Sequence, residues 1–246
     1  MRFGGTWLAC GSVLSTMDVA REHLAKSGEY GAVVQAQAQT AGRGRQGKAW
    51  FTPPEGTQVS MTVIGHPVAL RDAWRLAPMA GVAVVEGIEA CLPECGLRVR
   101  FPNDVLLSGR KLAGVLIETM SVPGEPELCT PLIGIGVNVN VPASAFPLEL
   151  QTQATSLRRE LEREITEPIA EQVVQALGRL WELPAEDWLA RWHGLLAPQA
   201  TRVFVLEGRA QRCRVVLLGA DGKLVVETEE GELRAISAAQ VILGEE

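Results

Sequence analysis

The sequence predicts an α+β fold with a mixed, largely antiparallel sheet, helices packed against that sheet, and a small C-terminal β-barrel. Apolar segments separated by short turns predict a meandering sheet between residues 98 and 139, and the long apolar segment 76–92 predicts a buried helix. After residue 198 the pattern changes to short apolar alternations separated by Glu-Gly and Asp-Gly turns, which is typical of a small β-barrel. We therefore expect two domains, 1–197 and 198–246.

The first elements are marked by a helix cap and by two apolar runs. Ser15 is placed to cap a helix over 16–27, and Gly28 is placed to end it. Apolar residues at 32–34 and 59–64 predict two neighbouring strands, so the glycine-rich segment between them is expected to project from the sheet.

The remaining elements are bounded by proline and by turn residues. Pro78 fits the first turn of the buried helix, and Pro93 ends it. A further helix is expected over 168–183, followed by one whose Trp188 and Trp192 belong to the core. The other strands are expected at 98–101, 105–107, 113–119, 132–139, 202–206, 213–218, 223–228 and 233–236.

Composition narrows the class of protein. Of 246 residues, 47% are hydrophobic and 21% are charged, which fits a globular chain, and no apolar run approaches the ~20 residues of a membrane helix. The first residues lack the apolar core of a secretory signal and the five cysteines are scattered, so we expect a cytoplasmic protein without structural zinc. The net charge of −6 argues against broad nucleic-acid binding.

The most informative segment is the glycine-rich loop from Thr40 to Trp50. Its three glycines let the backbone approach a ligand closely, and Arg43, Arg45 and Lys48 supply positive charge. This combination suits an anion such as phosphate, although the spacing matches neither a Walker A loop nor a glycine motif that opens a helix. Taken alone, the loop is equally compatible with a solvated hairpin tip.

Two further segments carry residues that a plain turn or strand does not need. The corner 100–104 (Arg-Phe-Pro-Asn-Asp) is followed closely by 110–114, which places Lys111 at the mouth of the next strand. Within 134–140, the predicted strand contains two glycines where bulky residues are usual. Such glycines indicate that another group packs closely against the strand. On their own, Asn-Asp would be better explained as turn residues, and Lys111 as a solvated charge of a hairpin.

Together these segments closely resemble the biotin protein ligases, motif by motif from Ser15-Thr16 to 134–140. The predicted C-terminal barrel is similar to the SH3-like domain of that family, whose catalytic domain is class II synthetase-like. The resemblance implies that biotin and Mg-ATP form biotinyl-5′-AMP and pyrophosphate. A lysine of a biotin carboxyl carrier domain then attacks the mixed anhydride and releases AMP.

The resemblance also implies roles for individual residues. As catalytic residues, Lys111, Arg43 and Arg45 would bring the biotin carboxylate and the α-phosphate together, beneath a loop that closes as a lid. Biotin would be bound by Ser15, Thr16, Met17, Gln39, Gly42, Arg43, Gly44, Arg45, Lys111 and Gly114. ATP would be bound by Arg45, Trp50, Asn103, Asp104, Lys111 and Asn138, with Asp104 holding Mg²⁺.

Other functions remain open at this point. A lipoate or octanoate ligase of the same broad fold also activates a carboxylic acid and passes it to a lysine. A non-catalytic biotin-binding protein would have the same fold without the activity. A ligase that also represses transcription would need a helix-turn-helix, for which there is no room before Ser15, so we expect no DNA binding. The sequence is compatible with a monomer or a homodimer.

Three positions depart from the family pattern: Met17 stands where asparagine is usual, Phe101 where tryptophan is usual, and Arg100 where lysine is usual. The thioether of Met17 supplies neither the donor nor the acceptor of an amide. We therefore predict that Met17→Asn tightens biotin binding, measured by titration calorimetry. Unchanged or weaker binding would contradict the expected placement of the ureido ring.

Overall fold

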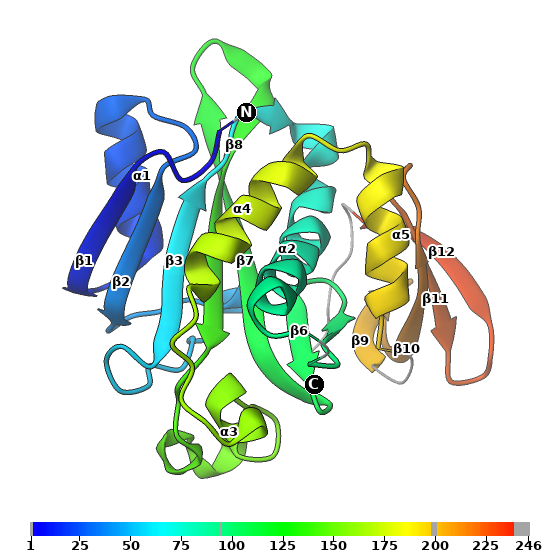
Figure 1. Cartoon of the computed structure of the whole chain (residues 1–246). Helices are drawn as coiled ribbons and strands as arrows, with labels where there is room; N and C mark the ends of the chain where they lie inside the picture. Colours follow the sequence, from blue (N-terminus) through cyan, green and yellow to red (C-terminus); the bar gives the residue numbers. More distant parts are fainter. Residues whose placement is uncertain (1, 94, 198–200, 239–246) are drawn as a thin grey trace.

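A computed structural model describes residues 2–93, 95–197 and 201–238 (Figure 1) and confirms the α+β class. One eight-stranded sheet has the order β1-β2-β3-β8-β7-β6-β5, with β4 beside β8. Its pairings are antiparallel except for β1 with β2. The strands are β1 (Trp7–Val13), β2 (Val33–Gln39), β3 (Gln58–Ile64), β4 (Val68–Ala69), β5 (Arg98–Arg100), β6 (Asp104–Leu107), β7 (Arg110–Val122) and β8 (Glu125–Asn138).

Helices cover both faces of this sheet. Alternate residues of β2 and β3 point to opposite sides, so that Val33 and Val63 join the core under α2 and α4, whereas Val34 and Ile64 pack with Met17 of α1. In Figure 1, α2 and α4 lie in front of the sheet and α1 lies beside β1 and β2. The helices are α1 (Thr16–Ser27), α2 (Leu76–Cys91), α3 (Leu157–Leu161), α4 (Ile169–Trp181) and α5 (Ala185–Leu195). Short 3₁₀ turns are η1 (Arg45–Gly47), η2 (Leu70–Arg75), η3 (Ala143–Ala145) and η4 (Leu148–Leu150).

The predicted caps of α1 are confirmed. Ser15 has an extended backbone and its Oγ accepts a hydrogen bond from the Met17 N–H. Gly28 ends the helix at φ 65°, a left-handed conformation that glycine adopts without steric cost. Because Ser15 begins the helix, the first turn of α1 is fixed next to the end of β2, where Gln39 accepts a hydrogen bond from the Thr16 N–H at 2.8 Å.

The other predicted elements form, most of the strands being longer than expected, and three further helices or strands are present. β2 and β3 are antiparallel neighbours, and β7 and β8 pair over most of their length as one long hairpin. Trp188 and Trp192 of α5 are each 1% exposed, which confirms them as core residues. β1, β4 and α3 were not predicted: β1 is an edge strand that contains Gly11 and lacks strict alternation, β4 has only two residues and α3 only five. None of the described helices is long and apolar enough to cross a membrane.

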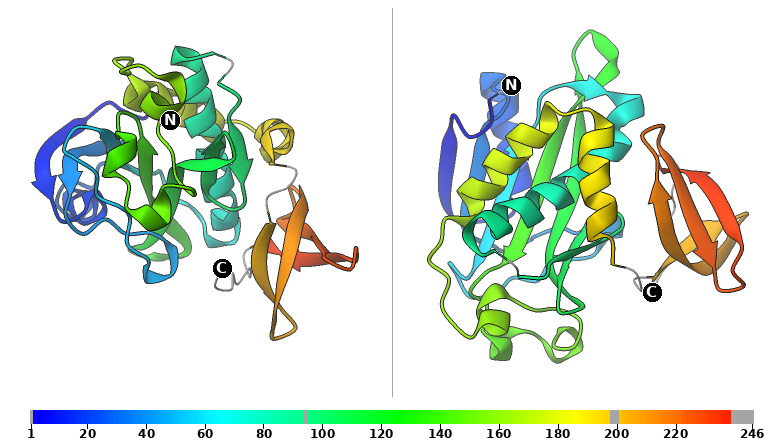
Figure 2. Two further views of the ribbon diagram at one scale, coloured as in Figure 1. Left: turned by 90° about the horizontal axis from the view of Figure 1, so that it is seen from below. Right: turned by 45° about the vertical axis from the view of Figure 1, so that its right-hand side comes forward.

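The C-terminal strands form a second sheet, set apart from the first beside α5 (Figure 2). They are β9 (Thr201–Leu206), β10 (Arg209–Leu218), β11 (Lys223–Thr228) and β12 (Leu233–Ser237). The predicted strands are thus present, but in the described residues they form an open antiparallel sheet with β9 and β12 at its edges, not a closed barrel. The expected domain boundary adjoins 198–200, which lie outside the described residues.

The second sheet contacts the main domain through specific side chains. The ring of Phe204 in β9 stacks on Phe101, with ring centroids 6.3 Å apart. At the other end of the contact, the Leu218 N–H donates to Nε2 of His193 in α5 at 3.2 Å. These contacts bring β9 against the corner between β5 and β6.

Close packing of α2 against α4 depends on a glycine. A Cβ atom added at Gly87 would lie 2.5 Å from the backbone nitrogen of Val173, so the helices would have to separate. At Gly81, in the same helix, an added Cβ would meet nothing within 4 Å.

We predict that Gly87→Ala lowers the free energy of unfolding by about 1–3 kcal/mol, as overpacking of a core does. The matched variant Gly81→Ala is expected to leave stability unchanged or raise it by up to about 1 kcal/mol, because alanine favours the helix. Urea denaturation measures both values. Equal effects at the two positions would contradict this account of the α2–α4 contact.

Candidate functional site

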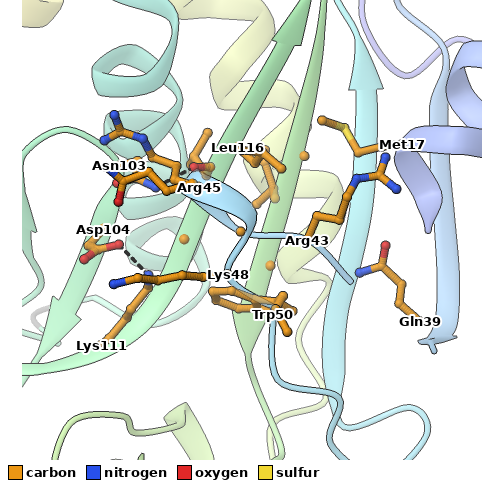
Figure 3. A pocket seen from close by; sticks show the side chains of 18 of the residues that line it. Met17, Gln39, Arg43, Arg45, Lys48, Trp50, Asn103, Asp104, Lys111 and Leu116 are labelled. Carbon is orange, nitrogen blue, oxygen red and sulfur yellow. Dashed lines mark hydrogen bonds and ion pairs between the residues drawn. The ribbon is translucent and has the colours of Figure 1, made fainter. Parts of the chain in front are cut away.

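A cavity of about 310 Å³ opens beneath the glycine-rich loop, on β7 and β8 (Figure 3). It lies where the start of α1, the end of β2, the corner between β5 and β6, and β9 converge. Most of the residues expected in the site line it. They are Ser15, Thr16, Met17, Gln39, Arg43, Gly44, Arg45, Trp50, Asn103, Asp104, Lys111 and Gly114.

The loop is folded as a short hairpin over the cavity. The Trp50 N–H donates to the Gly42 carbonyl at 2.9 Å, and the Gly44 N–H donates to the Lys48 carbonyl at 2.7 Å. Gln46, at the tip, has φ 55°. This hairpin directs Arg43 and Arg45 to opposite ends of the cavity, with Trp50 between them (Figure 3).

Trp50 occupies a slot made by two glycines. Gly114 of β7 and Gly136 of β8 are register partners, and an added Cβ would lie 2.9 Å and 2.7 Å, respectively, from the indole ring. The indole N–H donates to Gln58 Oε1 at 3.1 Å, and Nζ of Lys111 lies 5.3 Å from the ring centroid. The glycines of 134–140 therefore do have a group packed closely against them, as expected.

One end of the cavity, where Arg43 also lies, is rich in uncharged hydrogen-bonding groups. Gln39 Oε1 accepts from the N–H of Thr16 at 2.8 Å and from its hydroxyl at 3.1 Å, and that hydroxyl lies 2.8 Å from the Thr62 hydroxyl. Beside this cluster Met17 is 3% exposed, and its sulfur lies 3.2 Å from where a Cβ of Gly134 would be. The thioether thus fills a space over β8 that only a glycine leaves open.

The other end is cationic and is organised by Asp104. Its Oδ1 lies 2.6 Å from Lys111 Nζ, while its Oδ2 pairs with Nη2 of Arg100 at 2.8 Å and with Nη2 of Arg202. The side chain of Asp104 is 1% exposed. Burial opposes ionisation of Asp104, but the three cations outweigh it and hold the pKa of this carboxyl below its usual value.

Arg45 joins this cationic end, whereas Arg43 does not. Nη1 of Arg45 is buried without a hydrogen-bond partner among the described residues, and burial lowers the pKa of its guanidinium. An unpaired buried guanidinium nitrogen that lines a cavity is suited to an anionic ligand. Arg43 instead donates to both carboxylate oxygens of Asp18, at 2.9 and 2.8 Å, and to Glu118 at 3.3 Å.

Two expected residues lie outside the cavity lining. The Gly42 carbonyl closes the hairpin, and Asn138 accepts from Gln58 at 2.7 Å and donates to the Thr155 carbonyl at 3.0 Å. Asn138 therefore supports Trp50 through Gln58 rather than facing the cavity. Asn103 lines the cavity, but its side-chain amide donates to the Val115 carbonyl at 2.7 Å and holds the corner against β7.

Sequence reasoning missed several lining residues. From the glycine loop come Gln46 and Ala49, together with Lys48, whose positive charge was noted but which was not assigned to the biotin or ATP site; the others are Met61, Arg100, Val115, Leu116, Gly134, Ile135, Gly136, Leu150, Gln153, Arg202 and Val203. Arg100 and the glycines lay in motifs that had been singled out, so their position carried a signal. The sequence held no comparable signal for Arg202, because only the docking of β9 brings this residue to the cavity.

The surroundings of Asp104 do not fit a resident Mg²⁺ ion. Mg²⁺ prefers oxygen ligands, but this carboxylate is shared by three cationic side chains. Nor do the described ranges contain any group of three His, Cys, Asp or Glu side chains placed to hold a metal. The expectation that Asp104 holds a metal is therefore not supported by the donor set.

We predict that Asp104→Asn lowers the free energy of unfolding at pH 7 by roughly 3 kcal/mol, the low end for breaking a buried pair, because Lys111 and Arg100 are partly exposed. The exposed variant Asp187→Asn is expected to lose less than about 1 kcal/mol. Urea denaturation at several pH values measures both losses.

The difference between wild type and Asp104→Asn depends on pH with a definite sign. Because the folded-state pKa of Asp104 is lowered, its stabilisation is fully present above the unfolded-state pKa of about 4 and is lost as pH falls through the folded-state value. The difference should therefore shrink below about pH 4. If the difference in free energy of unfolding between wild type and Asp104→Asn does not change with pH, the stabilisation does not come from an ionised Asp104 carboxylate shared by the cations.

Known proteins of one family are similar to this chain. The family model described as the biotin/lipoate A/B protein ligase family matches residues 10–138. The bifunctional ligase/repressor BirA of Bacillus spizizenii is 33% identical over 246 residues, covering 94% of this chain and 72% of that protein. The biotin--[acetyl-CoA-carboxylase] ligase of Paracoccus denitrificans is 30% identical, covering 86% of this chain and 90% of the relative.

Solved structures show the same fold. The biotin protein ligase of Aquifex aeolicus, in complex with biotin and ATP, superposes with a TM-score of 0.76 at 22% identity, covering 98% of this chain and 100% of that one. A biotin protein ligase from Leishmania major in complex with biotin superposes with a TM-score of 0.67 at 23% identity, covering 95% and 98% of the two chains. The family model spans more than half of the chain, and the chain belongs to the biotin/lipoate A/B protein ligase family.

Proposed function

We propose that this protein is a biotin protein ligase that activates biotin with Mg-ATP and transfers it to a lysine of a biotin carboxyl carrier domain. The observation that carries the proposal is the division of one cavity into an end with uncharged hydrogen-bonding groups, a middle lined by Trp50 over Gly114 and Gly136, and a cationic end at Asp104. Biotin has the same order of parts: a ureido ring, an aliphatic chain and a carboxylate. The names of the relatives support the same activity.

The end with uncharged hydrogen-bonding groups suits the ureido ring. That ring offers two N–H donors and one carbonyl acceptor, which match the hydroxyl of Thr16 and the amide of Gln39. Met17 and Leu116 would contact the fused rings, and the aliphatic chain would run past Trp50 over Gly114. Its carboxylate would then reach Lys111 and Arg45.

In the first step a biotin carboxylate oxygen attacks the α-phosphorus of ATP, and the bond from that phosphorus to the bridging oxygen breaks. Pyrophosphate leaves with the electron pair. Two anions have to meet for this to occur, so positive charge at the junction lowers the barrier. Lys111 and Arg45 supply that charge. Arg43 would act on the junction only after exchanging its ion pairs with Asp18 and Glu118 for contacts with the ligand.

In the second step the neutral amine of the acceptor lysine attacks the acyl carbon of biotinyl-5′-AMP. The bond from carbon to the phosphate oxygen breaks, AMP leaves, and the amine loses a proton. Lys111 would stabilise the oxyanion that develops on the acyl oxygen. The glycine hairpin over the cavity would shield the mixed anhydride from water during both steps.

Several further features belong to this proposal. Residues 1–197 would form the catalytic domain and 198–246 a small β domain, in a cytoplasmic protein that acts as a monomer or a homodimer. Mg²⁺ would enter bound to the phosphates of ATP as part of the substrate, since the carboxylate of Asp104 already forms ion pairs with Arg100, Lys111 and Arg202. The acceptor would be a carrier domain with an exposed lysine.

The test is mass spectrometry of a carrier domain incubated with the protein, biotin and Mg-ATP. We expect a mass gain of one biotin, dependent on both substrates, and no gain with lipoate or octanoate. Lys111→Ala is expected to lower the rate by about 100- to 1,000-fold, because it removes a positive charge that stabilises the transition state. The exposed variant Lys26→Ala should match wild type. A wild-type protein that adds no biotin would overturn the proposal.

A further inference from the structure

The C-terminal sheet reaches the cavity through the side chain of Arg202, in the edge strand β9. This side chain is only 12% exposed. Its Nη2 pairs with Oδ2 of Asp104, and its Nε donates to the Phe101 carbonyl at 3.2 Å. Beside it, Phe204 stacks on the Phe101 ring. A single guanidinium therefore bonds to two residues of the corner 100–104, Phe101 and Asp104.

Asp104, in this corner, orients the side chain of Lys111. Asp104 is the one carboxylate among the described residues that line the cavity, and its Oδ1 holds Lys111 Nζ at 2.6 Å. The other oxygen, Oδ2, is occupied by Arg202 and Arg100. Because Oδ2 is bound from two sides, rotation of the carboxylate is restricted and Oδ1 is directed toward Lys111.

We propose that Arg202 is a positioning residue of the active site, which fixes Lys111 through Asp104. Through this side chain, the C-terminal sheet contributes to the rate of the reaction as well as to stability. This inference rests on the proposed ligase activity and adds to it a contribution from the second sheet. Arg202 acts through the corner and through Asp104, while Lys111 acts on the reacting groups.

The charge of Arg202 and its shape make separate contributions. The charge balances Asp104, and the planar fork allows the second bond to the Phe101 carbonyl. Lysine keeps the charge but presents no such fork. Arg202→Lys should therefore restore part of what Arg202→Gln loses.

The first test measures biotin-dependent pyrophosphate release in both Arg202 variants. We expect Arg202→Gln to lower kcat by about 10- to 100-fold, as small displacements of a catalytic group do. KM for biotin and for ATP should stay within about twofold of wild type, and Arg202→Lys should recover at least part of kcat. Arg212→Gln is the matched control, since Arg212 is exposed on the same sheet and bonds to Thr201; it should match wild type.

Two outcomes of this assay would overturn the inference. One is a wild-type kcat in Arg202→Gln with KM also unchanged; the other is a wild-type kcat with a raised KM for ATP, which would make Arg202 a direct phosphate ligand. Both require an active wild-type protein. An inactive wild type would instead count against the proposed function, so the two failures are distinguishable.

A double-mutant cycle separates positioning from stability. Asp104→Asn removes the link between Arg202 and Lys111, so Arg202→Gln should lower kcat by less than about twofold in that background. All four proteins are assayed at a temperature where circular dichroism shows them folded. If the fold-loss of kcat in the double variant equals the product of the fold-losses in the two single variants, Arg202 does not act through Asp104. That result would also overturn the inference.

Discussion

One buried carboxylate holds the functional half of this molecule together. Asp104 lies almost fully out of water, where an unpaired charge would be very unfavourable, and it is stabilised by cations from three different strands. Arg100 comes from β5, Lys111 from β7 and Arg202 from β9. The same ion pairs thus close the corner of the main sheet, orient a lysine over the cavity, and join the second sheet to the first.

Local signals in the sequence were sufficient for most of the fold. Ser15 and Gly28 act within one helical turn of the residues they cap, so the bounds of α1 followed from them. The edge strand β1 had no comparable signal, since its side chains are half-exposed and it is held by parallel pairing with a strand more than twenty residues away. Closure of the C-terminal sheet likewise depends on contacts between edges, which alternation does not encode.

The site was predictable to the extent that its residues sit in contiguous motifs. The loop around Arg45 and the corner at Asp104 were found because each is a contiguous motif and the motifs, taken together in their order, resemble those of one family. The slot for Trp50 depends instead on the register that places Gly114 opposite Gly136, and register is a property of the folded sheet. The ion pairs of Arg43 with Asp18 likewise join segments whose proximity no single motif contains.

The cation cluster also gives the protein an uneven electrostatic field. The chain carries a net charge of −6, yet Arg45, Arg100, Lys111 and Arg202 meet at one cavity around one carboxylate. Low-dielectric walls concentrate the potential of such a cluster toward its opening. An approaching polyphosphate is then repelled by the net negative charge of the chain and attracted at the opening of this cavity. Long-range attraction can select the face on which a nucleotide arrives before any hydrogen bond forms, and salt weakens that guidance.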